Sequence, residues 1–128
     1  MNDKRKILAV DDEEPIMRAS VRILDRIGYR AVGQSSAAAA FDTLRAQPGR
    51  FRLLLTDLNM PGISGIELAR MVHGIQPDLP VLLTSGLISE DLRREAQAAG
   101  VANVLLKPAG IEEIGRAVSL TINPTHHE

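Results

Sequence analysis

Cysteine and tryptophan are absent from this chain of 128 residues, and aromatic side chains are few. The lack of cysteine excludes disulfide bonds and thiol chemistry. Only Tyr29, Phe41 and Phe51 carry an aromatic ring, which predicts an aliphatic core and leaves no platform on which single-stranded bases could stack.

A large excess of charge of one sign is also missing, as is any long apolar stretch. The formal net charge is -1 and charged residues make up 24% of the chain, so no basic surface is expected to neutralise a phosphate backbone, and we expect no direct contact with nucleic acid. No segment approaches the roughly 20 apolar residues that cross a bilayer, and the chain begins without the apolar region of a signal peptide. These features predict a cytoplasmic protein that does not enter a membrane.

The length is that of one domain, which is large enough to bury a core. We therefore expect a single domain over residues 1–128, with its core at about 6–122 and flexible tails at 1–4 and 123–128.

Four short aliphatic runs, at 7–10, 53–55, 81–83 and 104–106, are typical of strands buried on both faces of a parallel sheet. Polar residues follow each run directly: Asp11 and Asp12, then Thr56 and Asp57, then Thr84, then Lys107. Because the carboxyl ends of parallel strands meet at one edge of the sheet, where ligands bind in open α/β folds, we expect these side chains to share one crevice.

The segments between the runs have helical length, so the chain is predicted to alternate strand and helix in a doubly wound α/β fold with five parallel strands and five helices. Pro15 suits the start of the first helix and Gly28 its end, and a second strand is expected near 30–34. Ser36 and Ser64 can cap the second and third helices.

Two helices differ in their apolar faces. The first is predicted to bury a stripe formed by Ile16, Ile23, Leu24 and Ile27. The fourth, near 90–99, has an apolar side made mostly of alanine and is expected to be loosely anchored, and the fifth is expected over about 110–122.

Taken singly, the polar positions have ordinary structural explanations. An acidic pair favours a following helix N-terminus, an aspartate before Pro61-Gly62 suits a turn, and Lys107-Pro108 can precede a helix. The convergence of all these positions instead indicates a functional site, because three carboxylates placed together repel one another by about 4 kcal/mol per pair at 4 Å. A Mg²⁺ ion would relieve this repulsion. With Lys107 and Thr84 nearby, the site would suit a phosphoryl group in transfer to a carboxylate nucleophile.

The segments 7–12, 55–62, 82–86 and 105–108 together resemble the receiver domain of two-component response regulators, which have a chemotaxis-regulator-like fold, and the resemblance covers about residues 6–122. It implies a flavodoxin-like sheet of order 2-1-3-4-5. It also implies that the domain takes a phosphoryl group from a phosphohistidine on a sensor histidine kinase or a histidine phosphotransfer protein, and acts as a signalling switch or phosphorelay intermediate. Such a domain catalyses its own phosphorylation and dephosphorylation and is not a turnover enzyme.

The resemblance also implies roles for individual residues. Asp57 is the phosphoacceptor. Asp12 is a direct Mg²⁺ ligand, Asp11 acts largely through water, and Asp57 and the backbone carbonyl of Asn59 complete the protein's ligands. Thr84 is the hydroxyl residue that moves toward the phosphoryl oxygen, and Lys107 is the cation that pairs with it. Asn59 and Gly86 occupy positions that tune the attack of water on the phosphoryl group.

One position departs from the family pattern. Receivers commonly carry an aromatic residue three positions before the lysine, where this chain has Val104. The usual aromatic switch is therefore in doubt, and output through Thr84 and the fourth helix, or phosphate transfer without conformational output, both stay open.

The wider context is less determined by the sequence. The sequence leaves open whether the domain forms a homodimer and whether it is a free-standing regulator. The stretch 78–86 resembles receivers at the C-terminal ends of hybrid kinases, which favours an origin in a hybrid kinase.

Other polar residues are interpreted as structural. We expect His73 to be a solvated residue at a helix end, and His126-His127 to lie in a tail. Arg18, Arg22 and Arg26 share one helix face, which is a solvated face or a docking surface. Turn or capping roles are expected for Ser35, Ser36 and Ser85.

Three rival functions make different demands on the sequence. A phosphatase of the haloacid-dehalogenase type would need a second carboxylate where Asn59 stands, and a flavin or dinucleotide site would need a glycine-rich loop after the first strand. The stronger alternative is a phosphorylation-independent interaction module of the same fold, although such modules usually lose an acidic residue or the lysine, and this chain retains both.

Overall fold

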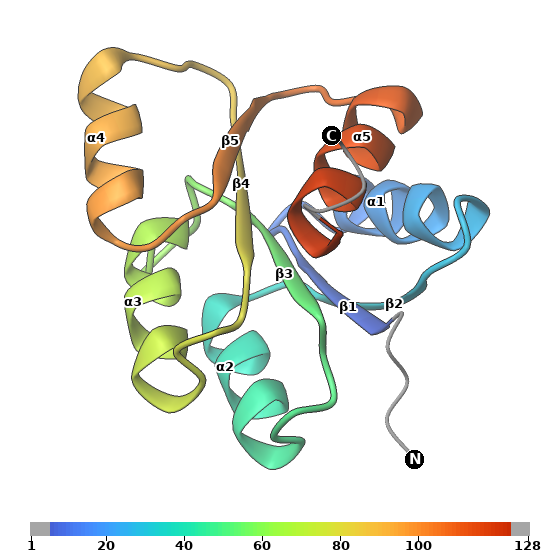
Figure 1. Cartoon of the computed structure of the whole chain (residues 1–128), viewed down its shortest axis with the longest axis horizontal. Helices are drawn as coiled ribbons and strands as arrows, with labels where there is room; N and C mark the ends of the chain where they lie inside the picture. Colours follow the sequence, from blue (N-terminus) through green and yellow to red (C-terminus); the bar gives the residue numbers. More distant parts are fainter. Residues whose placement is uncertain (1–5, 124–128) are drawn as a thin grey trace.

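The computed structural model describes residues 6–123. The tails predicted at 1–4 and 123–128, with His126 and His127, therefore lie outside the described residues, apart from Asn123, which caps the last helix. Within the described part, strands and helices alternate from the first residue to the last (Figure 1).

Five strands form one parallel sheet of order β2-β1-β3-β4-β5, as the sequence and the resemblance predicted. The strands are β1 (Lys6–Val10), β2 (Arg30–Gln34), β3 (Leu53–Asp57), β4 (Val81–Ser85) and β5 (Asn103–Leu106). The central strand β3 is buried along its whole length. This burial explains why its sequence is an unbroken apolar run up to Thr56 and Asp57.

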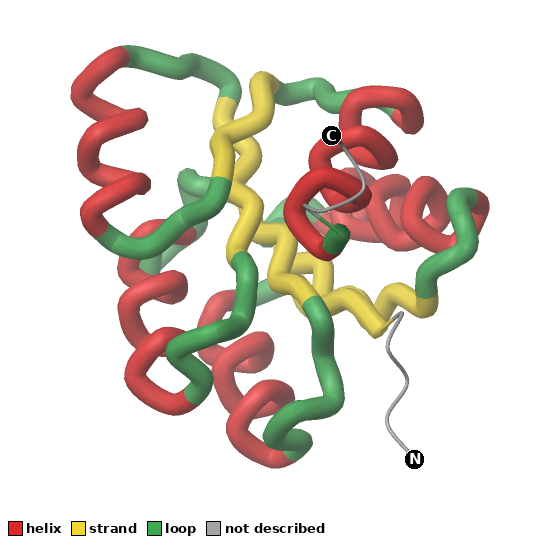
Figure 2. The backbone as a smooth tube through the Cα atoms, in the orientation of Figure 1, coloured by secondary structure: helices red, strands yellow, loops and turns green. Residues whose placement is uncertain are grey.

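Five helices cover the two faces of the sheet, which lies between them in Figure 2. They are α1 (Glu14–Arg26), α2 (Ala37–Ala46), α3 (Gly65–Ile75), α4 (Glu90–Ala98) and α5 (Ile111–Ile122). Helices α2, α3 and α4 enclose one aliphatic cluster with the sheet, and α1 and α5 enclose the other. No helix among residues 6–123 is long and apolar enough to span a membrane.

Local sequence signals account for the helix boundaries. Pro15 stands in the first turn of α1, and the hydroxyl oxygens of Ser36 and Ser64 accept backbone N–H groups at the starts of α2 and α3, as predicted. Gly28 and Gly100 follow α1 and α4 with φ of 103° and 84°, a conformation that favours glycine. The elements therefore begin and end where the sequence places them.

The buried face of α1 differs from the expectation. Leu24 is fully buried, but Ile16 is 36% exposed and Ile23 is only partly buried. Ile111 at the start of α5 is also exposed. The predicted apolar stripe of α1 is therefore only partly covered, because small residues of α1 and of the segment before α5 do not fill the space between the two helices.

Helix α4 is weakly buried, as its alanine-rich face predicted. Ala96 is its one buried residue, and Leu92 packs only partly against the core.

Candidate functional site

The carboxyl ends of neighbouring strands bring the predicted polar residues together. Val10 lies opposite Thr56 in the β1–β3 pairing, so Asp11 and Asp57 follow at the same edge, and Asp57 pairs in register with Thr84 of β4. The Leu58 N–H donates to the Thr84 carbonyl at 2.8 Å. This bond continues the β3–β4 ladder past Asp57 and holds the strand ends side by side.

Three carboxylates converge at this edge. Asp11, Asp12 and Asp57 each offer an oxygen, and these oxygens lie within 4.8 Å of one another. Asp11 and Asp57 are 4% and 5% exposed, whereas Asp12 is exposed. The Glu13 N–H donates to Asp11 Oδ1 at 3.0 Å, which orients this carboxylate at the entrance to α1.

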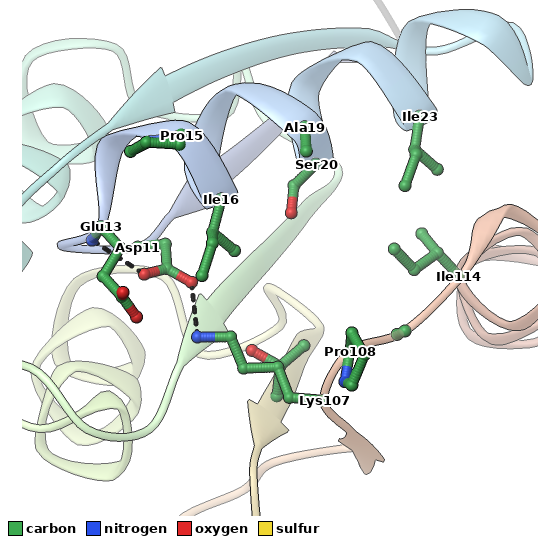
Figure 3. A pocket seen from close by; sticks show the side chains of 12 residues that line it. Asp11, Glu13, Pro15, Ile16, Ala19, Ser20, Ile23, Lys107, Pro108 and Ile114 are labelled. Atoms are coloured by element: carbon green, nitrogen blue, oxygen red, sulfur yellow. Dashed lines mark hydrogen bonds and ion pairs between the residues drawn. The ribbon is translucent and has the colours of Figure 1, made fainter.

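Lys107 reaches both buried carboxylates. Its Nζ lies 2.9 Å from Asp11 Oδ2 and 3.2 Å from Asp57 Oδ1, and Figure 3 shows the ammonium directed at Asp11. The Lys107 N–H donates to the Ser85 carbonyl at 2.8 Å, and the following bond to Pro108 is cis. The residue directly after β5 therefore places a cation at the sheet edge, within the carboxylate cluster.

Burial raises the pKa of Asp57 above its ordinary value, and the nearby charge of Asp11 adds to the increase. Hydrogen bonds from Lys107 and the Leu58 backbone oppose the increase without cancelling it. For Lys107, burial alone would lower the pKa, but hydrogen bonds to Asp11 and Asp57 outweigh burial, and the pKa is raised. Lys107 is therefore protonated and positively charged, whereas a negative charge on Asp57 is less favourable than it would be in the unfolded chain.

The other predicted site residues surround this group. Thr84 is partly buried in β4 and lines the same hollow as Asp11 and Lys107. Asn59 and Gly86 are exposed in the loops after β3 and β4. Ser85 has the predicted turn role, because its hydroxyl donates to the Leu87 carbonyl at 2.7 Å and accepts the Leu87 N–H at 3.3 Å.

The sequence interpretation missed Gly65, the first residue of α3. Its N–H donates to the Leu58 carbonyl at 2.9 Å, and a Cβ there would lie 2.3 Å from the Asp57 carbonyl oxygen. The buried Thr56 hydroxyl donates to that same oxygen at 3.0 Å. Thr56 therefore binds the Asp57 carbonyl directly, and Gly65 allows the start of α3 to approach the same carbonyl closely. A glycine directly after a capping serine was the available signal.

His73 contradicts the expectation of a solvated residue at a helix end. Its ring is partly buried, with Nε2 2.8 Å from the Leu79 carbonyl oxygen and Nδ1 3.2 Å from that of Ala99. A neutral ring donates to one of these oxygens and a protonated ring to both. His73 therefore links α3 to the segment before β4 and to the end of α4. The link depends on residues 26 positions apart, which a local pattern cannot reveal.

The donor set suits a small hard cation. Three carboxylates and one lysine leave a net negative charge, and Mg²⁺ prefers carboxylate oxygens completed by water. The chain has no cysteine to offer a thiolate, and His73, the histidine among residues 6–123, is engaged by backbone carbonyls. The cluster could therefore hold a divalent metal ion.

Comparison with known proteins agrees with this geometry. The model of the response regulator receiver domain family matches residues 7–119. The chain is 34% identical over 110 residues to the response regulator receiver protein CpdR of Brucella abortus (strain 2308), covering 86% of this chain and 90% of CpdR. It is 32% identical over 109 residues to the two-component response regulator ARR10 of Arabidopsis thaliana, covering 85% of this chain but only 20% of ARR10.

A solved structure shares the same architecture. The crystal structure of a response regulator receiver domain protein from Clostridium thermocellum superposes with a TM-score of 0.87 at 26% identity, covering 94% of this chain and 96% of that one. Fold, site geometry and sequence similarity thus converge, and this chain belongs to the response regulator receiver domain family.

Proposed function

We propose that Asp57 accepts a phosphoryl group and that Asp11, Asp12, Asn59, Thr84 and Lys107 assist the transfer. The observation that carries this proposal is the Lys107 ammonium, placed between two nearly buried carboxylates at 2.9 and 3.2 Å. A structural ion pair needs one carboxylate. Here two buried carboxylates lie beside a third, exposed one, so the site carries more negative charge than Lys107 can neutralise.

Asp11, Asp12, Asp57 and the Asn59 carbonyl would hold Mg²⁺. Such an ion would supply positive charge that offsets the negative charge of the carboxylates and of an incoming phosphoryl group. The need for such an ion agrees with the raised pKa of Asp57, which burial and the Asp11 charge cause.

Asp57 supplies the attacking oxygen and Lys107 the fixed cation. Once a phosphoryl group is attached, Lys107 can exchange its contact with the Asp57 carboxylate for one with a phosphoryl oxygen. Thr84, in register with Asp57, can donate its hydroxyl proton to the same group.

The proposed donor is a phosphohistidine on a sensor histidine kinase or a histidine phosphotransfer protein, as the family membership suggests, and the reaction takes place in the cytoplasm. The chain spans most of CpdR but about a fifth of the plant regulators it matches. Both a free-standing regulator and the receiver of a longer protein are compatible with this donor.

Output from the phosphorylated state does not use an aromatic switch at position 104. Val104 is 8% exposed in the core beneath α4, and it has no ring to reorient. We assign the response to Thr84 and to the weakly buried α4, which packs against the sheet next to Val104.

Intact-mass spectrometry after incubation with Mg²⁺ and acetyl phosphate tests the proposal. We expect a gain of one phosphoryl group in the wild type and in Asp42→Ala, which removes an exposed aspartate of α2, and no gain in Asp57→Ala or without Mg²⁺. A folded wild-type protein that gains no mass over a range of pH and donor concentration would contradict the proposal and favour a phosphorylation-independent interaction module.

A further inference from the structure

An open groove of about 480 Å³ begins at the carboxylate site and runs between α1 and α5 (Figure 3). At the site end it is lined by Asp11, Thr84 and Lys107, so the groove and the site are continuous. Farther along, its walls are apolar: Ile16, Ala19 and Ile23 on α1, and Pro108, Ala109 and Ile114 on the other side. A ligand held at Asp57 could therefore extend directly into an apolar channel.

The groove exists because small side chains face each other across it. Ala19 and Ser20 on α1 and Ala109 before α5 leave the gap that larger residues would fill. As a result Ile16, on the face of α1 that was expected to be buried, stays 36% exposed. An apolar surface that opens directly onto a charged site favours a ligand with an apolar body and a charged head.

The charges at the mouth restrict the ligand further. Lys107 is the cation that lines the groove, and Asp11 and Glu13 are the anions. A phosphoryl head can approach Lys107 and the carboxylates that would hold a metal ion. A negatively charged tail would be repelled by Glu13 and would lose its hydration against Ile16 and Ile23.

We propose that this groove is a subsite for the leaving group of small phosphodonors, and that it favours acyl phosphates with an aromatic or branched aliphatic acyl group. The inference rests on the proposed phosphorylation of Asp57. In the transfer, an Asp57 carboxylate oxygen forms a bond to phosphorus while the bond from phosphorus to the acyl oxygen breaks. The acyl group leaves as a carboxylate with that electron pair, so no proton, oxidant or further reactant is required.

The test compares the second-order rate constant of phosphorylation by benzoyl phosphate with that by phosphoramidate, which has no apolar body, in Mg²⁺ with intact-mass detection. Ala109→Phe fills the groove and Ile16→Ser makes its wall polar. We expect each variant to lower the ratio of benzoyl phosphate to phosphoramidate by about tenfold, the order of magnitude of losing one apolar contact in a pocket. Leu120→Phe, at an exposed position of α5 outside the groove, should keep the wild-type ratio.

Binding without transfer gives a second readout. Phenylphosphonate carries a phosphoryl-like head and a ring but cannot donate, so with Mg²⁺ it should shift the methyl NMR signals of Ile16, Ile23 and Ile114 in a saturable way. The Ile75 methyl on α3 should not move, and inorganic phosphate should not shift the groove methyls. Equal shifts with both probes would overturn the inference.

The outcomes separate this inference from the function on which it rests. No mass gain with benzoyl phosphate, phosphoramidate or acetyl phosphate would contradict phosphorylation of Asp57 and the subsite with it. If both donors phosphorylate the protein and the ratio of benzoyl phosphate to phosphoramidate is unchanged in Ala109→Phe and Ile16→Ser, the subsite alone is overturned. The groove would then be a contact for an apolar side chain of a protein donor.

Discussion

The folded structure raises the pKa of Asp57, because burial and the Asp11 charge outweigh the opposing effect of Lys107, so a negative charge on this group is less favourable than in the unfolded chain. A carboxyl group whose pKa is raised on folding stabilises the protein in acid, and this contribution is lost as the pH rises through the folded pKa. The metal-free protein therefore carries an unfavourable charge at neutral pH, which metal or a phosphoryl group can offset.

Asp57→Asn should consequently raise the free energy of unfolding of the metal-free protein at pH 7, because it removes a buried charge while Asp11 still pairs with Lys107. The gain should shrink toward acid, where the wild-type carboxyl group takes up its proton. Urea unfolding in EDTA across pH checks this, with the exposed Asp42→Asn as control. A gain that grows in acid, or no gain at pH 7, would contradict the explanation.

His73 joins three segments through its two ring nitrogens, and its ring lies against Gly100, where a Cβ would be 2.8 Å from it. His73→Phe keeps an aromatic ring there but removes the donors to the Leu79 and Ala99 carbonyls. We expect a loss of about 1–3 kcal/mol in the free energy of unfolding and faster amide exchange at the end of α4.

Arg94→Ala provides the comparison for His73, because Arg94 is an exposed residue of α4, the helix whose end His73 contacts, and has a 3.6 Å ion pair to Asp91. It should change stability by less than about 0.5 kcal/mol. Equal losses in both variants would show that the carbonyl contacts of His73 contribute nothing specific.

At the scale of single elements, Gly115 lies inside α5, where a glycine lowers the stability of the helix. A Cβ there would meet Ile27 Cδ1 at 3.6 Å and Cγ2 at 3.9 Å, which is ordinary van der Waals contact. Gly115→Ala should therefore stabilise the protein by about 0.5–1 kcal/mol through reduced backbone entropy in the unfolded state. Chemical denaturation measures the change, and a lower stability would mean that the α1–α5 contact cannot accept a methyl group.

Gly65 has the opposite environment at the start of α3. An added methyl group would stand 2.3 Å from the Asp57 carbonyl oxygen and 2.6 Å from a methyl group of Leu83. Gly65→Ala must push α3 away from β3, so we expect a loss of about 1–3 kcal/mol together with slower phosphorylation of Asp57.

Gly74→Ala, in the same helix, is the matched control for Gly65, since its Cβ would meet no atom within 4 Å. It should leave phosphorylation unchanged and stability equal or slightly higher. A Gly65→Ala protein with wild-type rate and stability would disprove the need for this close approach.

For the whole molecule, the metal site and the fold should be coupled. Asp11 and Asp12 follow β1 and Asp57 ends β3, so unfolding separates Asp57 from the other two carboxylates, and a Mg²⁺ ion at the proposed site would bind the native state alone. A metal concentration one hundred times Kd should then stabilise the protein by about 2.7 kcal/mol.

Thermal unfolding over a series of Mg²⁺ concentrations tests this coupling. Tm should rise with Mg²⁺ in the wild type and much less in Asp12→Asn, which removes one carboxylate at an exposed position with little effect on packing. The same rise in both proteins would indicate that Mg²⁺ acts elsewhere.

The sequence by itself determined the alternation of strands and helices, the placement of the polar residues at one sheet edge, and several helix starts. These features follow from interactions between residues close in the chain. Apolar runs such as 53–55 predict buried strands, and Ser36 and Ser64 cap helices through neighbouring N–H groups. Parallel strands then bring Asp11, Asp57, Thr84 and Lys107 together, because their carboxyl ends share an edge.

Only the tertiary structure decided which side chains touch across that framework. Lys107 contacts both buried carboxylates, His73 reaches carbonyls before β4 and after α4, and Gly65 allows α3 to approach Asp57. The same is true of Ile16, whose apolar character predicted burial although it borders an open groove. Each of these contacts depends on distances between elements, which are set by the volumes of side chains remote in sequence, and a local pattern carries no information about those volumes.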